Sequence, residues 1–278
     1  MKKALAAAWS ALLLGTMTLF VVNIGFMVAA VATDSFARRW LGTWLPEGYT
    51  GTWYAAAWKE FQLGSVLWVT TEVVFAVVAL AILVGVPAAY VLARHEFKGK
   101  KAVVLLFLLP LIIPPMTYGI PLATVMYQAH LAGTLGGVIL ANLIPALPFV
   151  ILIMTPFIEQ IDSNLESAAR VFGAGAPRMF LHVLAPLLAP GILAAGLLVL
   201  VRTLAMFELT FLVSGADSQT LVVSLYYAVF AAGVRAPQSV DAMAIVYMAV
   251  TLVWLLIALR FVNPTQLVSR VKEHPRPA

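Results

Sequence analysis

Three ionisable residues stand inside long apolar segments, where a charge is costly: Glu72, Arg202 and Glu208. An ionisable side chain at the middle of a bilayer costs roughly 2.5–3.5 kcal/mol on insertion scales, so it usually faces a cavity or a partner. Glu208 follows Arg202 by six positions, which on one continuous helix sets the two side chains about 120° apart. We therefore expect Arg202 and Glu208 on different faces of their helix, and Glu72 at the membrane interface.

Two interpretations of Arg202 and Glu208 stay open. In one, both residues line a path for a polar solute through the membrane. In the other, they pair with a second membrane protein or with residues near each of them. The path interpretation adds three polar residues from the neighbouring apolar segments: Tyr118, Gln128 and Asn142.

The residue types needed for catalysis or metal binding do not come together in this sequence. No nucleotide-binding loop of the form GxxxxGK[ST] occurs. The four histidines stand in different loops without ligand spacing, and there is no cysteine. No serine–histidine–acid arrangement is attributable to catalysis. We expect no catalytic residue, no metal ligand and no cofactor in this chain.

The composition is that of a chain embedded in a membrane. Hydrophobic residues make up 63% of the sequence and charged residues 10%, against about 25% charged in soluble domains. The mean hydropathy is +0.99. The apolar blocks exceed the roughly 20 residues that a helix needs to cross a bilayer, and a helix satisfies its own backbone polar groups. The net charge of +5 gathers at the ends of these blocks, so it indicates membrane topology and not nucleic-acid binding.

Six spanning helices are expected, at residues 9–33, 64–93, 102–127, 135–157, 190–213 and 241–262. Lysine and arginine are concentrated on the side of the N-terminus, which places both termini in the cytoplasm. The first block imitates a signal peptide, but its apolar run is too long for one, so we expect it to be retained. The predicted fold class is all-α, a polytopic membrane protein with six transmembrane helices and one short cytoplasmic helix.

The expected organisation has three parts. They are, in chain order, the first transmembrane helix with an outer, periplasmic loop (1–63), the transmembrane core (64–262) and a cytoplasmic tail (263–278). The outer loop is rich in tryptophan and tyrosine, which suits the membrane interface. A seat for an external protein is the alternative interpretation of these aromatic residues.

The polar segment between the fourth and fifth spans has the pattern of an amphipathic helix. Asp162 or Ser163 can cap the start of this helix, and Glu166 in its first turn suits the helix dipole. Gly173 then breaks the helix. A second short helix is expected from Arg178 towards the fifth span.

This segment resembles the cytoplasmic EAA loop of ABC importer permeases, and we call residues 158–189 the coupling loop. In that family Glu-Ala-Ala is followed after three residues by glycine and later by an aliphatic residue and Leu-Pro. Ser167 stands here at the place of the family's glutamate, and Glu166, one position earlier, is turned by about 100°. The resemblance implies that six residues couple the chain to an ATP-hydrolysing subunit: Glu166, Ser167, Ala168, Ala169, Gly173 and Pro186.

The resemblance extends over about residues 64–272. Three segments look like sugar-type permeases of the maltose kind: 87–100, 146–149 and 264–272. Two others look like polyamine- or phosphonate-type permeases: 133–137 and 207–212.

The resemblance implies a permease subunit of an ATP-driven importer in the bacterial inner membrane. The implied partners are a second permease subunit, two ATP-binding subunits that hold ATP and Mg²⁺, a periplasmic or lipid-anchored solute-binding protein and membrane lipid, with no nucleic acid. The expected solute is a sugar or polyol, because a polyamine site would need several carboxylates and stacking aromatic rings. The alternatives are a polyamine- or phosphonate-type permease, a secondary transporter driven by protons or sodium, and an intramembrane enzyme.

Overall fold

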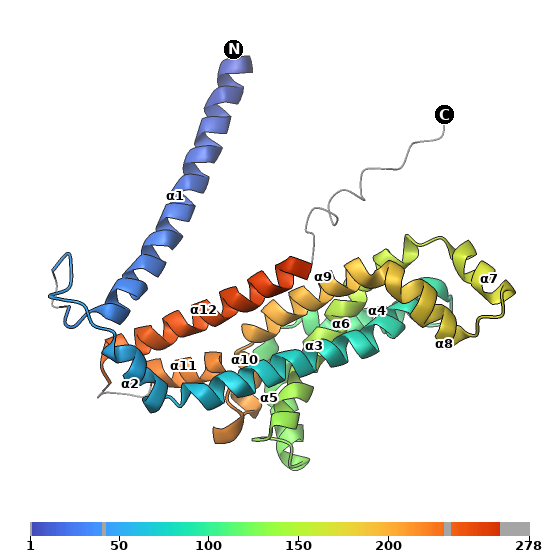
Figure 1. Cartoon of the computed structure of the whole chain (residues 1–278). Helices are drawn as coiled ribbons and strands as arrows, with labels where there is room; N and C mark the ends of the chain where they lie inside the picture. The colour runs from blue at the N-terminus through green and yellow to red at the C-terminus, as the bar shows by residue number, and fades with distance from the viewer. Residues whose placement is uncertain (1, 41–42, 231–234, 262–278) are drawn as a thin grey trace. The chain divides into compact units, whose positions relative to one another are not determined.

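The computed structural model describes residues 2–40, 43–230 and 235–261. Regular structure in these ranges is helical, and an isolated antiparallel bridge joins Ala37 and Tyr49 (Figure 1). By length and composition, five helices can cross a membrane, and a bent pair of helices brings the number to six. The predicted all-α, polytopic fold is therefore confirmed.

The chain divides into two compact units, one of residues 1–63 and 225–249 and the other of residues 64–224 and 250–278. The helices, in chain order, are α1 (Lys2–Phe36), α2 (Thr52–Glu60), α3 (Leu63–Arg94), α4 (Lys100–Ile112), α5 (Pro115–Gln128), α6 (Leu135–Glu159), α7 (Ser163–Val171), α8 (Ala176–Met179), the π-helix η1 (Phe180–Leu184), α9 (Ala185–Leu204), α10 (Glu208–Val213), the 3₁₀-helix η2 (Ala216–Ser218), α11 (Leu221–Phe230) and α12 (Pro237–Phe261).

The core of the second unit is formed by α3, α6 and α9, with α4 packed against α6. Val77, Met154 and Leu188 are among its fully buried side chains. Small residues let the backbones approach closely, since a Cβ added to Gly85 would lie 2.8 Å from the Val150 side chain. Within this unit α7 and α8 lie together at one end of the bundle (Figure 1).

The third predicted span, 102–127, is formed by a bent pair of helices and not by one straight helix. Helices α4 and α5 meet at an angle of 101°. Ile113 and Pro114 between them are extended, with ψ of 133° and 135°. Because a residue before proline is pushed away from the helical region, the consecutive Pro114 and Pro115 end α4 and start α5 afresh.

The fifth predicted span, 190–213, was placed wrongly. A helical run of 29 residues extends from Ala176 to Leu204 through the π-helix η1, and the chain then leaves the helix before α10. Arg202 therefore lies in the last turn of α9 and not half-way along a span. Since α9 and α10 are separate, the 120° estimate for Arg202 and Glu208 does not apply. The predicted tail, 263–278, and Val262 lie outside the described residues.

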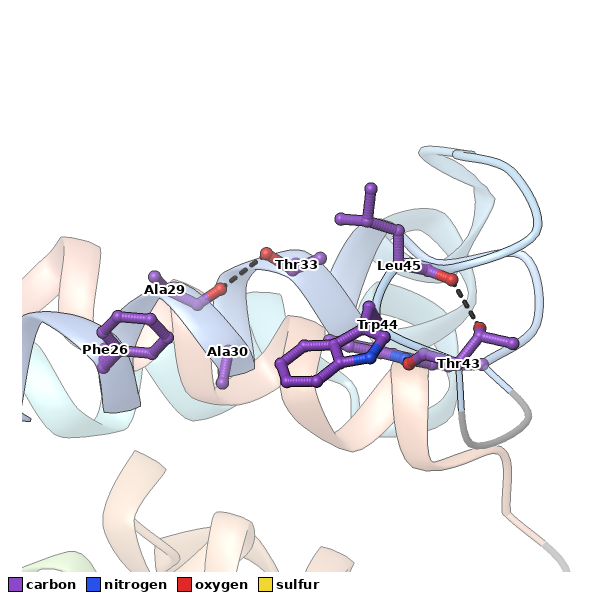
Figure 2. Close-up of a pocket in the computed structure, with 8 residues that line it drawn as sticks. Phe26, Ala29, Ala30, Thr33, Thr43, Trp44 and Leu45 are labelled. Atoms are coloured by element: carbon purple, nitrogen blue, oxygen red, sulfur yellow. Dashed lines mark hydrogen bonds between the residues drawn. The ribbon is translucent and has the colours of Figure 1, made fainter.

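In the first unit, the segment after α1 folds back on the end of that helix. The Ser35 and Tyr54 hydroxyl oxygens lie 2.8 Å apart, and the Trp53 indole N–H donates to the Ala37 carbonyl at 2.8 Å. A hollow of about 410 Å³ lies between α1 and this segment (Figure 2). It is lined by Phe26, Ala29, Ala30, Thr33, Trp40, Thr43, Trp44 and Leu45.

The same unit ties α2 to the start of α12. The Arg235 guanidinium makes an ion pair of 2.9 Å with Glu60 and lies 5.0 Å from the centre of the Phe61 ring. The Ser239 hydroxyl donates to Glu60 as well, at 3.4 Å. Contacts therefore hold the segment at its start, beside the end of α1, and at its end, beside α12.

Candidate functional site

The coupling loop forms two helical arms joined at Gly173. The first arm is α7, capped by Asp162, whose carboxylate accepts a hydrogen bond of 2.9 Å from the backbone N–H of Asn164. The predicted helix cap is confirmed, and of the two candidates, Asp162 and Ser163, the capping residue is Asp162. The second arm, α8, begins at Ala176, two residues before the predicted Arg178, and continues through η1 into α9.

Gly173 closes the first arm in a left-handed conformation, with φ of +82°. Its N–H donates to the Arg170 carbonyl at 2.9 Å, and the N–H of Ala174 donates to the Ala169 carbonyl at 3.0 Å. This pair of bonds is the Schellman ending of a helix, in which glycine is favoured because it has no Cβ. The predicted sharp break at Gly173 is confirmed.

Glu166 is buried at the inner face of α7, with 5% of its surface exposed. Its Oε1 accepts a bond from Arg94 Nε at 2.7 Å, and its Oε2 accepts one from the Tyr90 hydroxyl at 2.7 Å. Arg94 also donates to the Ile161 carbonyl at 2.6 Å, just before the helix cap. Both carboxylate oxygens are thus bound within the chain. We call Tyr90, Arg94 and Glu166 the α3–α7 brace.

The outer face of the loop is apolar and exposed. Leu165 is 46% exposed, Val171 84% and Phe172 90%. The residues predicted to couple do not include Val171 and Phe172. Their signal was present, since two large apolar residues stand next to a glycine in a polar segment.

The six residues predicted to couple fall into two groups in the structure. Ser167, Ala168, Gly173 and Pro186 are exposed. Ala169 is half-buried and packs on the core of the second unit, while Glu166 is turned inward into the brace. Their role in coupling stays a prediction, and the inward direction of Glu166 separates it from the exposed group.

A polar cluster forms where α5, α6, α9 and α10 meet. The Asn142 side-chain amide donates to the Val138 carbonyl at 2.9 Å and to the Thr210 hydroxyl at 3.0 Å. The Arg202 guanidinium carbon lies 5.2 Å from the centre of the Phe149 ring. The Tyr118 hydroxyl interacts electrostatically with both Arg202 and Glu208. The break after α9 makes this meeting possible, because it brings α10 against α5 and α6.

Two donors in the polar cluster have no acceptor among the described residues. These are the Tyr118 hydroxyl and the Arg202 Nε, both buried. A buried donor without a partner costs free energy unless another group binds it.

Among the predicted path residues, Tyr118 lies near Arg202 and Glu208, whereas Asn142 is bonded to Val138 and Thr210. Gln128, the last residue of α5, is exposed, and no described contact joins it to the cluster. Glu72 is exposed on α3. Within the described ranges, no group of three or more His, Cys, Asp or Glu could hold a metal ion.

A protein family matches more than half of the chain. Residues 81–272 match the family described as "Binding-protein-dependent transport system inner membrane component". The diacetylchitobiose uptake system permease protein NgcG of Streptomyces coelicolor is 31% identical over 153 residues, which are 55% of this chain and 51% of that protein. The molybdate/tungstate transport system permease protein WtpB of Thermococcus kodakarensis is 34% identical over 126 residues, which are 45% of this chain and 51% of that one. The chain thus spans about half the length of each relative.

A solved structure shares the fold over almost the whole chain. It is a bacterial ABC transporter involved in the import of the acidic polysaccharide alginate, and the match has a TM-score of 0.78 at 16% identity. The match covers 95% of this chain and 98% of that one. Since the family match alone spans more than half of the sequence, the chain belongs to the family of inner membrane components of binding-protein-dependent transport systems.

Proposed function

We propose that this chain is the permease subunit of an ATP-driven importer that carries a sugar or polyol across a bacterial inner membrane by alternating access. The observation that carries the proposal is the exposed pair Val171 and Phe172 on a loop held by a buried ion pair. Large apolar side chains that are exposed on a rigidly held loop are typical of a protein–protein contact. Because the sequence holds no nucleotide-binding loop, ATP and Mg²⁺ belong to a separate subunit that docks there.

The distribution of lysine and arginine supports an orientation with both termini and the coupling loop in the cytoplasm. The family description supports a solute-binding protein, periplasmic or lipid-anchored, on the other side. A second permease subunit and two ATP-binding subunits complete the proposed assembly. ATP binding would draw the ATP-binding subunits together and move the coupling loops, and the path would then open to the outside.

The polar cluster supports a sugar or polyol as the solute. Tyr118 and Arg202 offer buried donors without a partner among the described residues, and Arg202 lies beside the Phe149 ring, which suits a molecule with many hydroxyl groups. The likeness to NgcG and to the alginate transporter supports the same class. A polyamine would need several acids, and Glu208 is the one acid in this cluster.

An oxyanion such as a phosphonate is the second candidate solute. It is favoured by the Arg202 Nε, which has no acceptor among the described residues, and by the likeness to WtpB. The half-buried Glu208 nearby speaks against it, because a negative charge would repel the anion.

The test is to purify the complete chain from its own host in detergent and identify what co-purifies. The complex is then placed in liposomes, and ATP-dependent uptake is measured for a panel of sugars, polyols, phosphonates and molybdate. A co-purifying ATPase and uptake of a sugar or polyol would support the proposal. A lone six-span protein whose uptake follows a proton or sodium gradient would overturn it in favour of a secondary transporter.

A further inference from the structure

The α3–α7 brace joins two segments that are far apart in the sequence. Glu166 lies 72 residues after Arg94 and 76 after Tyr90. The side-chain surfaces of Arg94 and Glu166 are only 14% and 7% exposed. Charge-assisted bonds in such a setting are short and strong, and they fix the geometry of both partners.

The brace fixes α7 at more than one point. Arg94 binds the Glu166 carboxylate and the Ile161 carbonyl, which lie on either side of the helix cap. Two attachment points on one guanidinium restrain both the position and the rotation of the first turn of α7. Helix α7 therefore cannot rotate relative to the end of α3 unless at least one of these two bonds breaks.

The same end of α3 also contacts the second arm of the loop. The Tyr90 ring meets the Phe180 ring edge-on, with centroids 5.8 Å apart. Phe180 lies beyond the break at Gly173, in η1. The end of α3 therefore holds both arms of the coupling loop.

Helix α3 can carry a displacement away from the loop. Its 32 residues extend over about 48 Å, and the helix packs along α6 and α9 in the core. Near its other end, the Thr70 hydroxyl accepts the backbone N–H of Leu221 at 2.8 Å. A movement of α7 that keeps the brace intact must move the end of α3 with it.

We propose that the α3–α7 brace is the joint through which the coupling loop moves α3 during transport, with Tyr90 and Arg94 as positioning residues. This inference rests on the proposed function. In this proposal Arg94 transmits movement between α7 and α3, in addition to its fit to the positive-inside rule. Glu166 acts within the chain and is not one of the residues that touch the ATP-binding subunit. Uptake per ATP hydrolysed is the quantity that the joint controls.

The test uses Arg94→Gln and Tyr90→Phe in the complete importer complex, with Lys100→Gln as a matched control. Lys100 forms an ion pair of 2.7 Å with Glu96, whose side chain is exposed, outside the brace. For the two brace variants, uptake per ATP should fall by about tenfold or more, as expected for loss of a charge-assisted hydrogen bond. ATP hydrolysis should continue, and Lys100→Gln should keep the wild-type ratio.

A rescue separates the joint from a merely structural role. The chain has no cysteine, so Tyr90→Cys with Glu166→Cys gives one pair of thiols for a short thiol-specific crosslinker. Crosslinking should restore uptake per ATP towards the wild-type value, although it restores no charge. An unchanged ratio in the brace variants, or uptake and hydrolysis that fall together and are not rescued, would overturn the inference. A wild-type complex without ATP-dependent uptake would instead overturn the proposed function and the inference with it.

Discussion

Replacing Gly173 by aspartate should abolish transport while the chain still inserts into the membrane. Gly173 ends α7 with φ of +82°. A Cβ built there meets no atom of the described residues within 4 Å, so the first atom of a new side chain has room. The cost within the chain is therefore backbone strain, about 1–2 kcal/mol for a residue with a Cβ in the left-handed region. Asp and Asn tolerate this region better than Ala does.

The strain alone lowers the ratio of ordered to disordered loop by a factor of about 5–30. It cannot unfold the bundle, because α7 is also held by Asp162 and by the brace. A larger loss of uptake must come from the side chain itself at the docking surface. The three variants Gly173→Ala, Gly173→Asn and Gly173→Asp separate the two causes.

If docking is blocked by bulk, Asn and Asp abolish uptake while Ala keeps most of it. If strain decides, Ala is at least as harmful as Asn. The assay is ATP-dependent uptake in proteoliposomes, together with binding of the purified ATPase to the detergent-solubilised chain. The amount of chain in the membrane is measured in parallel. Wild-type uptake by Gly173→Asp would remove the assignment of this loop to coupling.

Three further changes have defined outcomes. Phe172→Ser removes a side chain that is 90% exposed, so the stability in detergent should change by less than about 0.5 kcal/mol. Binding of the ATPase should weaken by about 2 kcal/mol or more. Unchanged binding would exclude Phe172 as an anchor. Asn142→Leu breaks the buried bond to Thr210 and should lower the stability by about 0.6–1.7 kcal/mol. Thr210→Val should lower it less, because Asn142 stays bound to the Val138 carbonyl. Equal effects of the two variants in thermal unfolding would contradict this. Arg202→Met removes a charged side chain whose buried Nε has no acceptor among the described residues, so stability should be kept while uptake is lost, and normal uptake would place Arg202 outside the path.

The long apolar helices could be predicted from sequence because a run of more than about 20 apolar residues has few alternatives in a membrane. The start of α7 was equally readable, since its cap depends on Asp162 and its near neighbours. The break in the third span was not. The prolines were visible there, but the 101° turn between α4 and α5 depends on how α5 packs against α10.

The polar cluster was only partly predictable for a similar reason. Arg202 and Glu208 are recognisable as charges inside apolar sequence, but the angle between their side chains was predicted for one continuous helix. The end of α9 at Leu204 puts them on different elements. The meeting with Tyr118 then depends on contacts between helices that are far apart in the chain. Gln128 was included by residue type alone, and its exposed position at the end of α5 gives no support to that choice.

Arg94 shows how much an inference from sequence can leave out. As a cation at the end of an apolar helix it fits the positive-inside rule, and no local pattern reports a partner 72 residues away. That partner explains the departure of the loop from its family pattern. With Glu166 bound on both oxygens and Ser167 in place of the glutamate, no acid of α7 is free to hold an ATP-binding subunit by charge. Under the proposed function, docking of an ATP-binding subunit would therefore depend on the shape and apolar surface of Leu165, Val171 and Phe172. The polar inner face of α7 keeps that surface in register with α3.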